Sequence, residues 1–122
     1  MIRDPSLFSI LEKHGLEGVR SHAKLMEKII ERCVKIKAVV VAADEFDKNG
    51  VRIVLNFGHT VGHAIEAVSQ YSRAYTHGEA VAIGMLVAVD IAREMGVLKD
   101  PLLAERLEST LIKFHLPVYT KG

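Results

Sequence analysis

The sequence of 122 residues contains a single cysteine, Cys33, so no disulfide can form within the chain. Its first residues show no charged-then-apolar leader, and the two absences together lead us to expect a reducing, cytoplasmic location. Long hydrophobic runs are missing too. The longest stretch free of charged or strongly polar residues, 80–89, is half of the roughly 20 residues that a membrane helix needs. We therefore expect no membrane contact and interpret this stretch as part of a buried core helix.

An excess of charge of one sign is also missing, because 16 Lys and Arg residues stand against 15 Asp and Glu residues and leave a formal net charge of +1. Proteins that bind nucleic acid or an anionic membrane surface usually carry a basic patch. The balance argues against nucleic acid and favours a small molecule as partner. With 49% hydrophobic and 25% charged residues, residues 1–122 are expected to form one globular domain, with no room for a second of ordinary size.

Every element that the sequence predicts with good support is a helix. Apolar residues recur at three-and-four spacing from His22 to Val41, which predicts an amphipathic helix that continues through Ala43. A polar loop follows and ends in the turn pair Asn49-Gly50, around which a β-hairpin is the less favoured alternative. The other predicted helices, each with a proline or cap signal at its start, cover residues 5–13, 57–69, 76 to about 96 and 100–114. The expected fold class is an all-α helical bundle.

Three of the six histidines lie close together in the sequence, at His59, His63 and His77. His59 and His63 are stacked neighbours on one helical face, and an antiparallel pairing with the next helix would bring His77 within reach of the same ion. Three imidazoles and a water are a known zinc arrangement, although a helical histidine pair also occurs by chance on solvated faces. The neighbouring Gly58 and Gly62 each cost about 1 kcal/mol in a helix relative to Ala, which indicates close approach of another helix or a ligand. The remaining histidines lie among ordinary surface residues: His14, His22 and His115.

The zinc-protease pattern His-Glu-x-x-His is excluded, because Thr60 follows His59. Asn56 is a suitable N-cap for the helix that carries the histidines, and the free N–H groups at such a helix start would bind a phosphate or carboxylate. Arg52, four residues upstream, would add positive charge there. From its spacing alone, Arg52 is equally well interpreted as a solvated loop charge.

Two sequence blocks are long and specific: RIVLNFGHTVGHAIE at 52–66 and HGEAVAIGM at 77–85. Together with the preceding KAVVVAADE at 37–45, they closely resemble the signature of the 3-dehydroquinate synthase family of the shikimate pathway. The resemblance runs from the N-terminus to about Lys121. It implies conversion of 3-deoxy-arabino-heptulosonate 7-phosphate to 3-dehydroquinate and phosphate, with tightly bound NAD and a divalent metal, usually zinc or cobalt.

The resemblance also implies a role for each histidine. It makes His59 and His77 metal ligands, and His63 a catalytic histidine near the reacting centre, which replaces the picture of three coordinating imidazoles. The metal would polarise the hydroxyl that is oxidised.

Further residues are implied to contact the substrate. Lys37 and Arg52 correspond to contacts with the substrate carboxylate and hydroxyl groups, and Asn56 corresponds to the contact on the phosphate side. An acidic residue shortly before the arginine is implied as well. The loop is one residue longer than usual, so either Asp47 or Glu45 could fill that role, and we rank Asp47 first.

Several family features are absent from these 122 residues. The third metal ligand, a Glu, and a substrate-binding Lys would lie before Met1, and the NAD-binding domain is missing. We expect the two-histidine site to bind zinc weakly unless water, Glu79 or a partner chain completes it. We also expect the chain on its own to be a fragment without turnover, to expose apolar surface and to self-associate as a homo-oligomer.

Three alternatives stay open at this point. A related sugar-phosphate cyclase such as 2-deoxy-scyllo-inosose synthase shares this helical half. Iron-dependent alcohol or glycerol dehydrogenases share the His-x-x-x-His then His-Gly layout, and the fuller block NFGHTVGHAIE at 56–66 argues against them. A non-catalytic, metal-binding helical module is the third.

Overall fold

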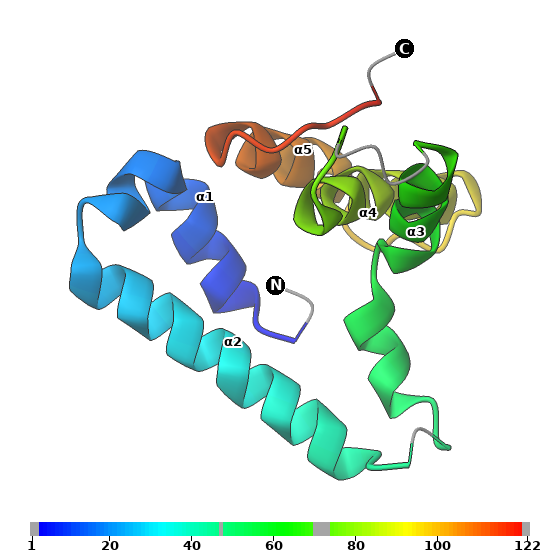
Figure 1. Cartoon of the computed structure of the whole chain (residues 1–122), viewed down its shortest axis with the longest axis horizontal. Helices are drawn as coiled ribbons and strands as arrows, with labels where there is room; N and C mark the ends of the chain where they lie inside the picture. Colours follow the sequence, from blue (N-terminus) through cyan, green and yellow to red (C-terminus); the bar gives the residue numbers. More distant parts are fainter. Residues whose placement is uncertain (1–2, 47, 70–73, 121–122) are drawn as a thin grey trace. The chain divides into compact units, whose positions relative to one another are not determined.

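The computed structural model describes residues 3–46, 48–69 and 74–120, and this part of the chain is helical without a strand (Figure 1). Its elements are α1 (Pro5–Arg20), α2 (Ala23–Ala43), the 3-10 helix η1 (Val51–Asn56), α3 (His59–Val68), α4 (His77–Glu94) and α5 (Leu103–Lys113). The predicted all-α class is confirmed, and the alternative hairpin around Asn49-Gly50 is wrong because helices flank that turn. The chain divides into two compact units, residues 1–55 and 56–122, which are described separately. The predicted single domain over residues 1–122 stays a prediction.

In the first unit, Asp4 joins the start of α1 to the middle of α2. Its carboxylate accepts the backbone N–H of Leu7 at 3.0 Å, as an N-cap does, and the Nε–H of Arg32 at 2.8 Å. The Arg32 hydrogen bonds and then the Leu7 N–H lower the pKa of Asp4 from 3.8 to about 2. The ionised carboxylate therefore holds the two helices together at neutral pH.

The first helix is longer than the sequence predicts. A helix over residues 5–13 was expected to end at His14-Gly15, and Gly15 does break the helical geometry with φ 62° and ψ −174°. The predicted break is therefore confirmed, but a second helical segment, which the sequence did not predict, follows at once and continues to Arg20. Gly15 tolerates this positive φ because it has no Cβ.

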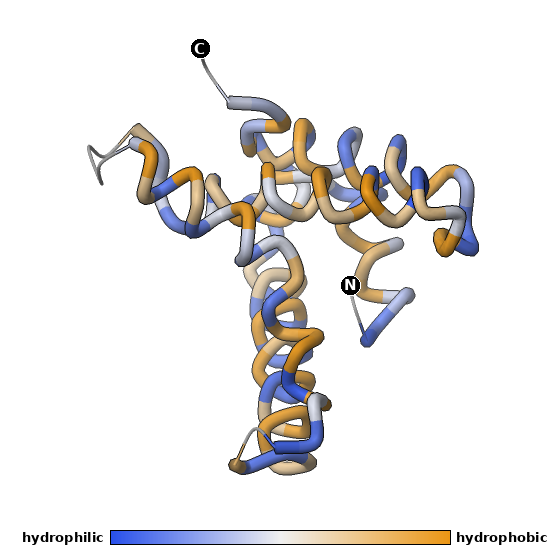
Figure 2. The backbone as a smooth tube through the Cα atoms, turned by 90° about the vertical axis from the view of Figure 1, so that its right-hand side faces the viewer, coloured by the Kyte–Doolittle hydropathy of each residue, from blue (hydrophilic) through white to orange (hydrophobic). Residues whose placement is uncertain are grey.

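The second helix agrees with its predicted extent, Ala23–Ala43 against 22–43. Hydrophobic and hydrophilic residues alternate along its turns (Figure 2). Only Val40 in this helix is fully buried, at 5% exposure, whereas Ile30 and Val34 are 56% and 61% exposed. Part of its apolar stripe is therefore open to solvent.

In the second unit, α4 begins with the predicted capping box. The Thr76 hydroxyl accepts the backbone N–H of Glu79, and the Glu79 carboxylate accepts the backbone N–H of Thr76 at 2.7 Å. The helix ends at Glu94, and Gly96 adopts a positive φ of 68° just beyond it, as predicted.

The last helix starts later than predicted, at Leu103 instead of Pro101. The Asp100 carboxylate accepts the backbone N–H of Leu102 at 3.0 Å and the Nη1–H of Arg106 at 2.9 Å. Residues 100–102 thus form a turn ahead of the helix, because the Asp100 side chain satisfies a backbone donor locally. The helix buries Leu107 and Leu111.

No helix in the described ranges has the length and apolar character required to cross a membrane. The sequence also predicts a connecting loop over 71–75, between the two histidine-bearing helices, and this loop lies mostly outside the described residues.

Candidate metal centre

Three glycines allow α3 and α4 to approach each other at backbone distance. A Cβ on Gly58 would lie 2.6 Å from the Val81 carbonyl oxygen and 2.7 Å from the Met85 nitrogen, and one on Gly62 would lie 3.1 Å from the Val81 Cα. A Cβ on Gly84 would overlap the Gly58 carbonyl oxygen and lie 3.0 Å from the Gly62 nitrogen. Gly58 contacts Met85, and the later residue Gly62 contacts the earlier residue Val81, so the two helices are antiparallel. The predicted close approach at Gly58 and Gly62 is confirmed.

The start of α3 differs from the prediction. The N-cap is Gly58, with φ 80° and no side-chain capping bond, and the helix begins at His59. Asn56 is exposed and ends η1, so its predicted role as N-cap is wrong. The reason is that the chain turns at Gly58, where the contact with α4 leaves no space for a side chain. The anion site that depended on an Asn56 cap is therefore not built at that residue.

The antiparallel helices bring the three predicted histidines together. The ring centroids of His59 and His77 are 5.2 Å apart, and His63 lies 5.7 Å from each of the other two. An ion about 2.0–2.1 Å from each of three imidazole nitrogens would hold the ring centroids roughly 5 Å apart. The spacing of the centroids is thus compatible with one divalent ion, but the donor atoms within 4.8 Å of one another belong to His63, Glu66 and His77 and not to His59.

Two of these histidines have one ring nitrogen engaged by a neighbouring oxygen. His59 Nδ1 lies 3.3 Å from the Phe57 carbonyl oxygen, and His77 Nδ1 lies 3.2 and 3.3 Å from the two carboxylate oxygens of Glu66. Histidines that bind metals usually donate the N–H of the other ring nitrogen to such an acceptor. The arrangement leaves Nε2 of His59 and of His77 available for a metal.

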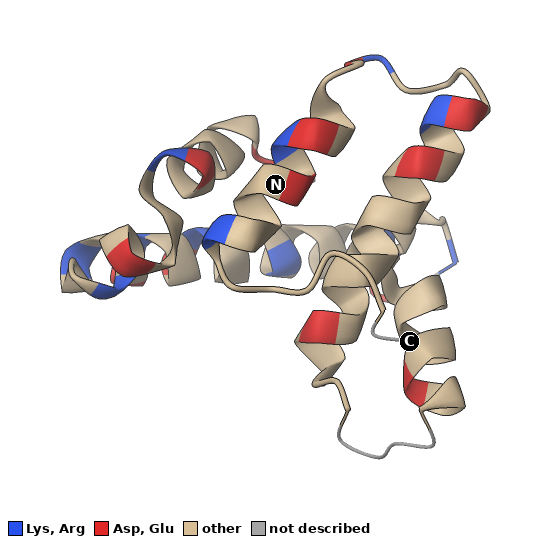
Figure 3. Ribbon diagram, turned by 90° about the horizontal axis from the view of Figure 1, so that it is seen from above, with Lys and Arg blue, Asp and Glu red and all other residues tan. Residues whose placement is uncertain are grey.

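Glu66 is a residue of this site that the sequence did not predict. It follows His63 by three residues and His59 by seven, which places it on the same face of α3. Charged residues are sparse along α3 and α4 (Figure 3), and Glu66 is the only one in α3. This lone acid beside a histidine face was the signal that could have revealed it.

A possible ligand group follows from the position of Glu66. His63, Glu66 and His77 offer ligand atoms that all lie within 4.8 Å of one another. Two imidazoles and one carboxylate form a donor set that is typical of catalytic zinc. Glu79, which the sequence suggested as a completing ligand, instead bonds the Thr76 backbone and hydroxyl at 2.7 and 2.8 Å.

The other predicted site residues belong to the first unit. Lys37 is exposed on α2, and Arg52 lies in η1 with its Nη1 3.5 Å from the Glu45 carbonyl oxygen. Asp47 lies outside the described residues, and Glu45 is exposed. The structure therefore brings together the three histidines of the second unit, and the roles of Lys37 and Arg52 stay predictions.

Asp44 organises the loop before Arg52, which sequence reasoning missed. Its side chain is buried, and its carboxylate accepts backbone N–H groups of Lys48 at 2.8 Å, Asn49 at 3.1 Å and Val51 at 3.0 Å. Burial raises the pKa of Asp44, but the backbone N–H groups, that of Asn49 first, outweigh it and hold the pKa below its ordinary value. The ionised carboxylate thus satisfies donors that the turn leaves free.

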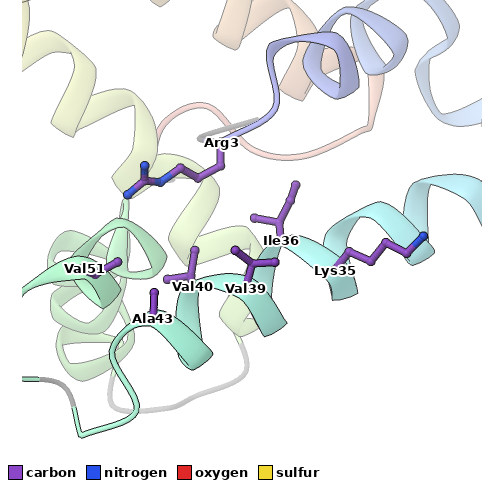
Figure 4. A pocket seen from close by; sticks show the side chains of 7 residues that line it. All are labelled: Arg3, Lys35, Ile36, Val39, Val40, Ala43 and Val51. Carbon is purple, nitrogen blue, oxygen red and sulfur yellow. The ribbon is translucent and has the colours of Figure 1, made fainter.

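The first unit also contains a cavity of about 380 Å³ between the end of α2 and η1. Ile36, Val39 and Val40 face this space beneath Arg3, whereas the Lys35 side chain extends along the helix (Figure 4). Its walls are apolar and it contains no cluster of titratable groups. It is therefore no candidate for the chemistry of the histidine site.

Comparison with known proteins identifies the family of the chain. The family model described as 3-dehydroquinate synthase C-terminal matches residues 1–122. The 3-dehydroquinate synthase of Wolinella succinogenes is 48% identical over 114 residues, which cover 93% of this chain and 31% of that protein. The synthases of Streptococcus pneumoniae R6 and Chlamydia abortus are 43% and 39% identical, over 97% and 95% of this chain. The chain spans about a third of the length of these relatives. By the match of its whole length, it belongs to the 3-dehydroquinate synthase family, whose C-terminal part it resembles.

Proposed function

We propose that this chain is the metal-binding helical part of a 3-dehydroquinate synthase. It would serve the conversion of 3-deoxy-arabino-heptulosonate 7-phosphate to 3-dehydroquinate and phosphate. The observation that carries the proposal is the meeting of three imidazole rings where α3 and α4 cross, with centroids 5.2–5.7 Å apart. NAD, which the family uses, would be bound by a part of the enzyme outside this chain.

His59 and His77 would hold a divalent ion, zinc or cobalt. Each has its Nδ1 engaged by an oxygen acceptor, so each can offer Nε2. The ion, when bound, would polarise the substrate hydroxyl that is oxidised. A third ligand would come from outside the chain or from water, so we expect the 122 residues alone to bind the ion weakly and to have no turnover.

His63 would act as a catalytic residue that moves a proton. Among the described residues no hydrogen bond engages its ring, which lies beside the rings of His59 and His77, so its nitrogens are available to a substrate. A neutral imidazole has one protonated and one unprotonated ring nitrogen, so the same side chain can donate or accept a proton.

Lys37 and Arg52 would bind the substrate carboxylate and hydroxyl groups. Asn56, which caps no helix, would contact the phosphate side through its exposed side chain. Asp47 would supply the acidic group, with Glu45 as the alternative. These assignments rest on the matching motif at 37–66 and on the exposure of Lys37 and Asn56. The partner is thus a phosphorylated sugar acid.

The test is a chimaera in which this chain replaces the matching 31% of the Wolinella succinogenes synthase. We expect phosphate release from the heptulosonate phosphate in the presence of NAD and zinc or cobalt. His59→Ala with His77→Ala should abolish both metal binding and turnover, whereas His63→Ala should abolish turnover and retain the metal. His115→Ala, on an exposed residue of the same unit, is the matched control and should change neither.

Two results would overturn the proposal. One is a folded chimaera that binds the metal, NAD and the heptulosonate phosphate but releases no phosphate. The other is loss of the metal in the His63→Ala variant to the same degree as in the His77→Ala variant, because His63 would then be a ligand and not a proton carrier.

A further inference from the structure

We infer that Glu66 is a positioning residue of the metal centre, because it accepts the Nδ1–H of His77 and so leaves Nε2 as the metal-binding atom. The inference rests on the proposed function in one respect, that His77 is a ligand. The position of the proton on the His77 ring can be measured without any metal.

The contact is formed by the first residue of α4 and a residue two turns into α3. His77 Nδ1 lies 3.2 Å from Glu66 Oε2 and 3.3 Å from Oε1. The Glu66 side chain is only 19% exposed, while that of His77 is 54% exposed. A partly buried carboxylate needs a donor, and the histidine supplies it.

The chemical consequence concerns the tautomer of His77. A neutral imidazole carries its proton on one nitrogen only, and the hydrogen bond made by that nitrogen decides which one it is. A carboxylate beside Nδ1 keeps the proton there and raises the basicity of Nε2 as a ligand. His59 has the same pattern with a weaker acceptor, since the Phe57 carbonyl oxygen lies 3.3 Å from its Nδ1.

A direct bond from Glu66 to the metal is the competing arrangement, because His63, Glu66 and His77 offer donor atoms within 4.8 Å. Two features favour the indirect role. Both carboxylate oxygens lie almost equally far from one ring nitrogen, as expected for acceptors of a shared N–H. In addition, if the carboxylate moved onto a metal, His77 Nδ1–H would lose its acceptor.

The first experiment is ¹⁵N NMR of the histidine rings in the metal-free chain at pH 8, where an unperturbed imidazole is neutral. We expect His77 to carry its proton on Nδ1. Glu66→Ala should shift the proton toward Nε2, whereas Glu66→Gln, whose amide oxygen still accepts, should retain the wild-type tautomer. Glu108→Ala removes an exposed carboxylate from α5 and serves as the control. The inference would be overturned if the wild-type His77 carried its proton on Nε2, or if the Glu66→Ala variant had the same His77 tautomer as the wild type.

The second experiment is a cobalt titration of the metal-free chimaera, followed by visible absorption. Glu66→Ala should weaken cobalt binding about 10- to 100-fold, the usual effect of losing such a partner, with an unchanged spectrum of the bound ion. If Glu66 were a ligand, both Glu66→Ala and Glu66→Gln would change the spectrum, and the positioning role would be refuted. Failure of the proposed function has a different signature: no phosphate release from the chimaera, with the His77 tautomer still dependent on Glu66.

Discussion

Replacing Gly84 by alanine tests the packing that builds the histidine site. Within α4, a Cβ at this position would overlap the Gly58 carbonyl oxygen and lie 2.9 Å from the Gly58 carbonyl carbon and 3.0 Å from the Gly62 nitrogen. All three atoms belong to backbone, so no side-chain rotation can relieve the overlap. The helices must separate or slide.

The magnitude follows from two opposing terms. Overpacking a well-packed contact typically destabilises a protein by about 1–3 kcal/mol. Because only backbone atoms clash here and no side chain can rotate away, we expect the upper end, about 3 kcal/mol. Alanine gains about 1 kcal/mol over glycine in a helix interior. We therefore expect Gly84→Ala to lower the free energy of unfolding by about 2 kcal/mol.

The assay is urea unfolding followed by circular dichroism, with Gly78→Ala as the matched variant. Gly78 also lies in α4, but no atom lies within 4 Å of its added Cβ, so only the helix gain remains. Gly62→Ala, with contacts of 3.1 Å, should fall between the two. Equal stability of the Gly84→Ala and Gly78→Ala proteins would refute the close packing of α3 on α4.

Three further outcomes are expected. Folding lowers the pKa of Asp4 from 3.8 to about 2. The ionised Asp4 carboxylate therefore stabilises the folded state fully above pH 3.8, and this stabilisation is lost as the pH falls toward 2. In the Asp4→Asn variant, whose side chain can still cap α1, the midpoints of urea unfolding at pH 5 and pH 2 should differ less than in the wild type. Asp44→Ala leaves backbone donors without an acceptor, and exchange of the Lys48 and Val51 amides should accelerate about tenfold. Ile30→Asp, on the exposed apolar side of α2, should reduce self-association in light scattering; a wild-type monomer at high concentration would contradict that expectation.

The sequence predicts helices well where their signals are local. The capping box of Thr76 and Glu79 lies within four residues, and the periodicity of α2 repeats over its whole length, so both elements have their expected bounds. The start of α3 depends instead on a contact between Gly58 and residues more than twenty positions later. A polar side chain at Asn56 was a plausible cap, but tertiary packing decided where the helix begins.

In the candidate site, too, the features with a local sequence signal were predicted and those that depend on tertiary contacts were not. The pairing of His59 with His63 follows from helical spacing, and the approach of His77 follows from a short connection between antiparallel helices. Glu66 was not predicted because, on the inference above, it orients a ligand and is not one itself, so the spacing of the histidines does not indicate it. The placement of Lys37 and Arg52 against the histidines depends on how distant segments assemble, which no local pattern encodes.

Packing and chemistry are linked through the register of α3 on α4. Gly58 meets Met85, Gly62 meets Val81, and Glu66 meets His77, so each step of four residues along α3 is matched by a step of four back along α4. A slide of one helical turn, about 5.4 Å, would break the 3.2 Å contact between Glu66 and His77. If Gly84→Ala displaces α4, the His77 proton should therefore leave Nδ1 although no titratable group has been changed. A variant that is destabilised but keeps the wild-type tautomer would show that the clash is relieved by separation of the glycine contact without a change of register.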